Sequence, residues 1–245
     1  MWCVRADPGC VALRPAAKDN KRNTMSEKTY AYFIALIGVV CGWVVIRRSF
    51  SPASLSLHNA LVQGFFVGFG LAVVTIEIVA RATVTRINGW ITIFGCGEPG
   101  NGMFLRAACA RIFPGPVNSP QEAVYWRTQV DSAGHMLSGE YNYVLHFPLD
   151  GLPPVDAFWS LTMADAKERF VANPIDRYCV SNQSGLAPNA DGSFDIYVQN
   201  AAPAGHGSNW LPAPTGKFRL WLRAYMPSAA ILDGTYTVPP VVKVK

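Results

Sequence analysis

The side chains best suited to chemistry lie on one face of a single predicted strand, residues 218–225. Every second residue of this run is apolar, and the intervening positions are Arg219, Trp221, Arg223 and Tyr225. Alternation of this kind predicts a strand whose two faces differ. Guanidinium forks beside aromatic rings suit a sugar or a carboxylate, so this face is the first candidate for ligand binding. The alternative is that a second sheet packs on it and Asp residues pair with the arginines.

Three further residues complete the predicted ligand-binding set: Arg177, Asn209 and Trp210. Asn209 and Trp210 open the segment "NWLPAP", whose prolines Pro212 and Pro214 restrict the backbone before the strand begins. We expect these prolines to fix a corner and Trp210 to fill the end of a sandwich. The segment is therefore predicted to be a fold determinant before it is a binding loop.

Paired carboxylates would support a different chemistry, the hydrolysis of a carbohydrate. A glycosidase needs two carboxyl groups across the scissile bond, and one of them has a raised pKa. The candidates in the sequence are Asp156, Asp165, Asp176, Asp191, Asp195 and Asp233. Asp191 and Asp233 precede glycine and are typical of turns. A carbohydrate-active hydrolase is therefore the second hypothesis.

Several other classes of site receive no support from the spacing of residues. The glycines of residues 95–100 fit G-x-G-x-x-G, but Glu98 would place negative charge beside a phosphate and Pro99 lacks an amide donor, so no dinucleotide cofactor is predicted. No dense basic block stands beside aromatic residues, which argues against nucleic acid as a partner. No metal is predicted, because the four histidines lack ligand spacing: His58, His135, His146 and His206.

Two uncharged runs, residues 30–46 and 60–76, predict a hairpin of two transmembrane helices at about 30–46 and 60–79. At about 1.5 Å per residue each run nearly crosses a hydrocarbon core of about 30 Å. The second run contains Gly64 and Gly68, a small-xxx-small spacing that lets membrane helices approach closely. The lipid bilayer is thus a predicted partner, and a homo-oligomer through Gly64 and Gly68 is a further one. Ordinary tolerance of glycine in lipid is the alternative explanation.

Residues 1–28 lack periodicity and are expected to be a disordered tail or an over-extended gene start, with Met25 as an alternative first residue. The choice between Met1 and Met25 changes the balance of flanking positive charge that sets membrane orientation. Cys96 and Cys109 would pair in an oxidising compartment, and free or buried thiols are the alternative.

The rest of the sequence predicts a mainly β structure. Short alternating runs near 141–147, 157–163, 194–198 and 218–225 are separated by turn signals, which favours an antiparallel sandwich or jelly roll. Residues 89–94 suggest a further short strand. Helices are expected at about 103–113 and, as one or two turns, at 164–172. Residues 81–122 are accordingly assigned to a connecting segment and 123–245 to the β domain.

Five blocks appear in order along the β part: "PPVDAFWSLTM", "NPIDRY", "DGSFDIYVQ", "NWLPAP" and "LRAYMP" with "LDGTY". Together they closely resemble the bacterial family called domain of unknown function 1214, over roughly residues 123–242. One departure is Ala164, where the family often has tyrosine. The resemblance implies a jelly-roll-like β domain, alone behind a membrane anchor, and implies no established reaction.

The combined expectation is an integral membrane protein of the bacterial inner membrane. Its C-terminal domain would be periplasmic, as the resemblance rather than the charge implies. The domain would serve as a binding or assembly module for a glycan or another polar ligand. Hydrolysis of a carbohydrate remains the alternative.

Overall fold

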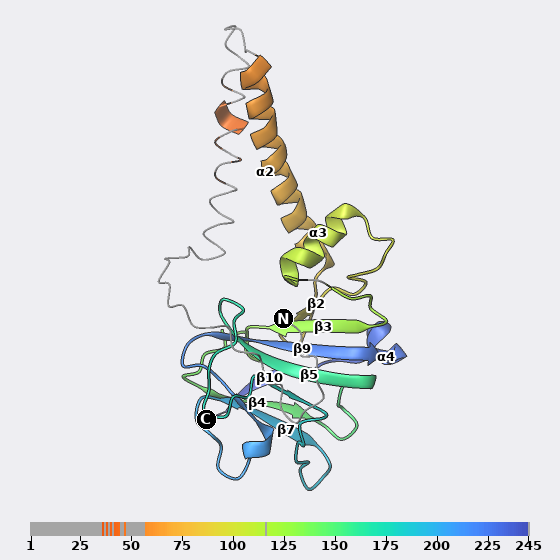
Figure 1. Ribbon diagram of the computed structural model, residues 1–245, viewed down its shortest axis with the longest axis vertical. Coiled ribbons are helices and arrows are strands. Elements are labelled where there is room, and N and C mark those ends of the chain that lie inside the picture. The colour runs from red at the N-terminus through yellow and green to blue at the C-terminus, as the bar shows by residue number, and fades with distance from the viewer. Residues whose placement is uncertain are drawn as a thin grey trace. The chain divides into compact units, whose positions relative to one another are not determined.

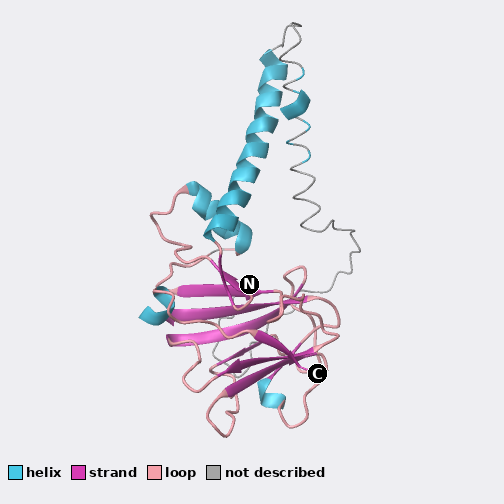
Figure 2. Ribbon diagram, turned by 180° about the vertical axis from the view of Figure 1, so that it is seen from behind, coloured by secondary structure: helices cyan, strands magenta, loops and turns pink. Residues whose placement is uncertain are grey.

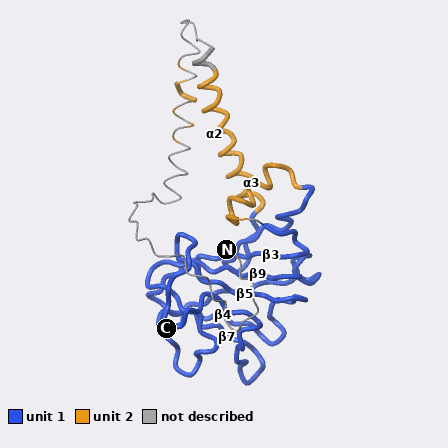
Figure 3. The backbone as a smooth tube through the Cα atoms, viewed as in Figure 1, with its two compact units in different colours: residues 1–14, 84–100, 116–245 blue, residues 15–83, 101–115 orange. Residues whose placement is uncertain are grey.

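The computed structural model describes residues 57–115 and 117–244, together with residues 36, 38, 40, 42–44 and 47 (Figure 1). The chain divides into two compact units (Figure 3). The described part of one unit comprises residues 84–100 and 117–244, and that of the other comprises 57–83 and 101–115 together with the scattered positions before residue 48. The predicted tail, residues 1–28, lies outside the described residues.

The smaller unit contains helices α2, Leu57–Thr83, and α3, Met103–Ile112, which pack against each other. Within α2, residues Leu61–Thr83 are long and apolar enough to cross a membrane. The helix expected at about 103–113 is thereby confirmed as α3. The first predicted span lies largely outside the described residues, although the positions described in it are helical.

Glycine positions on α2 differ sharply in their surroundings. A Cβ atom added to Gly70 would lie 3.2 Å from the Cα atom of Gly38, so these two backbones approach closely. A Cβ atom added to Gly64 or Gly68 would meet no atom of the described residues within 4 Å. The close contact within the chain therefore uses Gly70, whereas the glycines of the small-xxx-small spacing face open space.

The larger unit contains two sheets, which Figure 2 shows as separate layers. One sheet is antiparallel throughout and has six strands in the order β1-β2-β3-β9-β5-β6. In that order the strands are Thr85–Ile87, Trp90–Thr92, Ala123–Thr128, Phe218–Pro227, Val155–Asp165 and Cys179–Ser181.

The other sheet has four strands in the order β10-β4-β7-β8. They are Val241–Val244, Asn142–Phe147, Phe194–Gln199 and Trp210–Pro212. Its strands pair antiparallel except for β7 and β8, which run parallel because the connection between them crosses back through the 3₁₀ helix η1, Gly207–Asn209. The short helix α4, Ala229–Leu232, follows β9. The domain is thus mainly β, as predicted, but one sheet is mixed.

The core lies between the sheets and receives alternate side chains from both, as a two-layer arrangement requires. Phe218, Leu220 and Leu222 of β9 are buried in it. Edge-to-face packing joins Phe218 to Tyr143 of β4, with ring centroids 5.8 Å apart. Since these alternate residues of β9 point into the core, the residues between them lie on the outer face of the six-stranded sheet.

The short helix expected at 164–172 is wrong. Strand β5 continues to Asp165, where Ala164 and Asp165 still pair with β9. Asp165 Oδ1 then accepts hydrogen bonds from the backbone N–H groups of Lys167 at 2.7 Å and Arg169 at 2.9 Å, which closes a turn instead of a helix. Strands β1, β3, β8 and β10, which the alternation did not reveal, complete the two sheets.

Candidate functional site

Four of the predicted ligand-binding residues meet on the outer face of the six-stranded sheet, joined by one arginine from β3. We call this set the arginine face: Arg127, Arg219, Trp221, Arg223 and Tyr225. Register explains the grouping, because Arg127 pairs with Trp221 across β3 and β9. Trp221 is buried, with 8% of its surface exposed, whereas the arginines and Tyr225 are half-buried. Solvent therefore reaches the polar members of the face.

Glu168 lies over one end of the arginine face and accepts hydrogen bonds from three of its side chains. Its Oε1 atom accepts from the guanidinium of Arg219 and from Arg127 Nη1, the latter at 3.4 Å. Its Oε2 atom accepts from the indole N–H of Trp221 at 2.7 Å. The arginine pairing anticipated from the sequence therefore exists, but the partner is a glutamate on the β5–β6 loop, not an aspartate.

Arg223 differs from the other two arginines. Its Nη1 atom donates a hydrogen bond to the Thr162 hydroxyl at 2.8 Å, and its guanidinium carbon lies 5.6 Å from the ring centroid of Trp221. Among the residues that the structure describes, it has no carboxylate partner. A guanidinium has five N–H donors, so the contacts of Arg223 leave most of its donor capacity available.

The surroundings of Arg223 are aromatic and hydroxylic. Tyr125 and Ser160 lie opposite it on β3 and β5. Burial raises the pKa of Tyr125, against the opposing effects of its hydrogen bond to Asn118 and of the positive charge of Arg223. Tyr225, the next residue of β9 on the same face, stacks on Phe158 with ring centroids 4.4 Å apart. The combination of a cation, neutral hydroxyls and flat rings suits an acidic or sugar-like ligand.

The remaining three predicted residues, Arg177, Asn209 and Trp210, lie together at a corner of the fold. Arg177 Nη1 donates to the carbonyl oxygens of Gly207 at 2.7 Å, Ser208 at 3.1 Å and Trp210 at 2.9 Å. Burial lowers the pKa of Arg177. This guanidinium donates to main-chain carbonyl groups of η1 and β8. Its contacts therefore stabilise the backbone of this corner.

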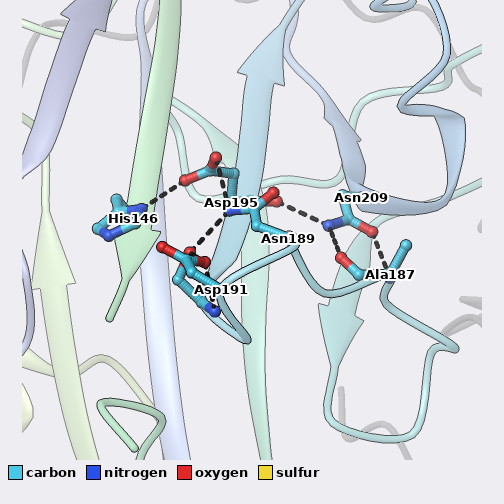
Figure 4. A network of polar contacts seen from close by, with 7 residues as sticks. His146, Ala187, Asn189, Asp191, Asp195 and Asn209 are labelled. Atoms are coloured by element: carbon cyan, nitrogen blue, oxygen red, sulfur yellow. Dashed lines mark hydrogen bonds and ion pairs between the residues drawn. The ribbon is translucent and has the colours of Figure 1, made fainter. Parts of the chain in front are cut away.

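Asn209 and Trp210 are likewise engaged with the main chain. The Asn209 amide bonds to both the N–H and the carbonyl of Ala187, each at 2.8 Å, and donates to the carbonyl of Asp195 at 2.9 Å (Figure 4). Trp210 Nε1 donates to the carbonyl of Gln199 at 2.9 Å, and the side chain is buried. The corner residues therefore hold β8 beside β7 and lie apart from the arginine face.

A second polar cluster joins residues that the sequence presented separately (Figure 4). His146 Nδ1 lies 2.7 Å from Asp195 Oδ1, and Asn189 donates to Asp195 Oδ2 at 3.0 Å. His146 and Asp195 are direct cross-strand neighbours on β4 and β7. The period-2 alternation of both runs indicates which face of its strand each residue occupies. Pairing the two residues also requires the register between the strands, which the alternation alone does not give.

The carboxyl groups whose pKa is shifted do not resemble a glycosidase acid. Hydrogen bonds from the side chain and backbone of Ser193 lower the pKa of Asp191, and those from Thr235 lower the pKa of Asp233. Burial acts to raise the pKa of Asp165, but hydrogen bonds from Arg169 and Lys167 outweigh it and lower that pKa. Within residues 57–115 and 117–244, no three His, Cys, Asp or Glu side chains cluster as metal ligands would.

Two solved structures are among those similar to this chain. The VPA0106 protein from Vibrio parahaemolyticus has a TM-score of 0.58 at 22% identity, over 80% of this chain and 47% of that one. A putative uncharacterised protein from Burkholderia cenocepacia has a TM-score of 0.40 at 18% identity, over 80% and 46%. This chain spans about half the length of each, and the first likeness shows the fold alone.

The sequence matches no curated protein. A family model described as a protein of unknown function (DUF1214) matches residues 122–229, a segment that begins just before β3 and ends just after β9. It contains the corner, the Glu168 loop and every residue of the arginine face. The resemblance drawn from the five sequence blocks is thereby confirmed over residues 122–229, which match the DUF1214 family model.

Proposed function

We propose that this protein is a membrane-anchored binding module of the bacterial envelope. A two-helix hairpin would hold it in the inner membrane, and a jelly-roll-like domain in the periplasm would bind a polar ligand at the arginine face. The ligand is a glycan or another polar molecule that carries an acidic group. The observation that carries the proposal is the half-buried guanidinium of Arg223, which lacks a carboxylate partner among the described residues.

Burial gives this observation its weight. Removing a charge from water is costly, and buried charges in proteins are normally paired. Arg127 and Arg219 follow that rule through Glu168, whereas Arg223 donates to a hydroxyl and lies over an aromatic ring, and no carboxylate of the described residues pairs with it. An acidic ligand would supply the missing charge, and the partly exposed ring of Tyr225 would provide a flat surface for a sugar.

Anchoring is supported by the surface of α2. Large apolar side chains are exposed along it, among them Leu61 at 65%, Phe65 at 66% and Leu71 at 62%. Such a surface is costly in water and favourable in lipid. The close approach of Gly38 and Gly70 supports the hairpin. Gly64 and Gly68, which face open space, would be available for the homo-oligomer.

The periplasmic placement is supported by the state of the cysteines. Cys96, Cys109 and Cys179 are each disulfide-bonded, and disulfides persist in oxidising compartments such as the periplasm. A topology reporter fused after Lys245 tests the placement directly. A fusion active only in the cytoplasm would overturn it.

Hydrolysis of a carbohydrate is the less favoured of the two proposed functions. A general acid needs a raised pKa, and the shifted carboxyls, Asp165, Asp191 and Asp233, are all lowered. Each of these three is engaged in hydrogen bonds that shape a turn. We therefore propose binding as the function of the domain, with hydrolysis of a carbohydrate as the alternative.

The test is a binding screen with the full chain in detergent or nanodiscs, against neutral and acidic glycans and small carboxylates. An acidic ligand should bind, and Arg223→Ala should weaken it by at least tenfold, because a charge-assisted hydrogen bond contributes about 1.5–3 kcal/mol. Arg86→Ala, an exposed arginine of the same sheet, is the matched control. Equal affinity in Arg223→Ala and the parent chain would refute the site.

A further inference from the structure

Helix α3 exposes large apolar side chains on one face and buries small ones on the other. Met103 is 74% exposed and Phe104 is 45% exposed, whereas Ala108 and Cys109 are buried. Arg106 and Arg111, both exposed, border the apolar pair. A short helix with exposed apolar residues and cationic neighbours is typical of segments that lie in the membrane interface.

The position of α3 relative to α2 also indicates the membrane interface. Arg111 Nε donates to Glu77 Oε1 at 2.7 Å, so the last turn of α3 is fixed to the C-terminal part of α2 within the same unit (Figure 3). Glu77 directly follows the uncharged run of residues 60–76, which is about 25 Å long at about 1.5 Å per residue. If α2 spans a bilayer, Glu77 therefore marks the level at which hydrocarbon gives way to headgroups.

We infer that α3 is an interfacial helix that inserts Met103 and Phe104 among anionic lipids at the foot of α2. This inference rests on the proposed anchoring and adds a second, peripheral contact with the bilayer. The apolar pair would enter the boundary between headgroups and acyl chains, and the guanidinium groups of Arg106 and Arg111 would face the lipid phosphates.

Charge favours lipid over a protein as the occupant of this face. Arg81, in the last turn of α2, adds a third cation to those of α3, and Glu77 of α2 is paired with Arg111. Anionic headgroups lie next to any spanning helix, so the helix face and its partner are brought together without a separate binding event. Cations near an anionic membrane surface are attracted to its headgroups.

The test uses the full chain in vesicles of phosphatidylethanolamine and phosphatidylglycerol that contain a photoreactive diazirine phospholipid. After illumination, mass spectrometry locates the lipid adducts. We expect adducts on α2, at Phe65 or Phe69, and also on α3, at Met103 or Phe104. Leu149, which is 63% exposed on the β unit, serves as an internal site that should remain unlabelled.

Variants separate the inference from the anchoring proposal. The double variant Met103→Ser with Phe104→Ser should reduce α3 adducts to background and leave α2 adducts unchanged, whereas Leu149→Ser should change neither. Arg106→Glu, or vesicles of phosphatidylcholine alone, should reduce α3 adducts severalfold.

Adducts on α2 without adducts on α3 would overturn the inference and leave anchoring intact. Absence of adducts on α2 would refute anchoring itself, and the interfacial role with it. Crosslinks between two copies at α3, without lipid adducts there, would replace lipid with a second chain and also overturn the inference.

Discussion

Trp221 donates its indole N–H to Glu168 Oε2 across 2.7 Å, and this bond ties the β5–β6 loop to the centre of the six-stranded sheet. Glu168 has a φ of +61°, a left-handed backbone that a residue other than glycine seldom adopts. Its carboxylate also receives the guanidinium groups of Arg127 and Arg219. The loop conformation is therefore maintained by side-chain contacts against its backbone preference.

Replacing Glu168 should be costly. Glu168→Ala removes an acceptor that two half-buried guanidinium groups and one indole N–H share, so we expect the free energy of unfolding to fall by about 1–3 kcal/mol. Glu168→Gln keeps one acceptor oxygen and should lose less. Denaturant unfolding of the full chain in detergent measures both, and the exposed Glu140→Ala provides the control. Equal stability of Glu168→Ala and Glu140→Ala would contradict the role of this carboxylate.

Asn209 offers a second test, at the corner. Asn209→Ala removes a buried amide that bonds to the main chain at Ala187 and Asp195, and we expect a loss of about 1–3 kcal/mol. Asn209→Asp retains an acceptor for the N–H of Ala187 but cannot donate, so it should also destabilise. Asn142→Ala, at an exposed position, should change stability by less than about 0.5 kcal/mol. A neutral Asn209→Ala would show that the corner does not depend on this amide.

The free energy of unfolding at acid pH should depend on Asp165. Its pKa is lower in the folded protein than in the unfolded chain, so its ionised form stabilises the fold above the ordinary carboxyl pKa of about 3.9. That stabilisation is lost as the pH falls through the lowered pKa of the folded state. Asp165→Asn should therefore be less stable than the parent at pH 7, and the gap should narrow towards pH 2. Unfolding curves across this range measure it, and a constant gap would argue against the assignment.

Gly70 and Gly64 should respond differently to the same substitution. A valine at position 70 would press its Cβ atom against Gly38, and overpacking of this kind costs about 1–3 kcal/mol. A valine at position 64 meets open space and should leave the folded chain unchanged. Resistance to unfolding in increasing fractions of sodium dodecyl sulfate compares the two variants. If Gly64→Val unfolds first, the close contact has been assigned to the wrong glycine.

The strand that carries the arginine face was predictable because its alternation is strict. Phe218, Leu220 and Leu222 could enter the core only if Arg219 and Arg223 lay on the opposite side, and the structure has this arrangement. The corner was also indicated, since Pro212 and Pro214 restrict the backbone that follows Trp210. Local pattern was sufficient for the two faces of this strand and for this corner.

The partners of the arginines were not predictable, because they depend on contacts distant in sequence. Glu168 reaches Trp221 only because Asp165 closes a turn where a helix was expected. Arg127 joins the face through pairing of β3 with β9, nearly a hundred residues apart along the chain. His146 and Asp195 meet through a register that neither run specifies alone. Strand order and register, which single-sequence patterns leave open, therefore determined the site.

Strand β9 lies in the middle of the six-stranded sheet, with β3 on one side and β5 on the other. Main-chain hydrogen bonds restrain it along both edges, and its inner side chains are held by the core. Its outer side chains thus project from one of the least mobile segments of the domain. A ligand at Arg223 would meet groups that are already in place, so little free energy would be needed to order them. Variants at this face should therefore alter the lifetime of the complex more than its rate of formation.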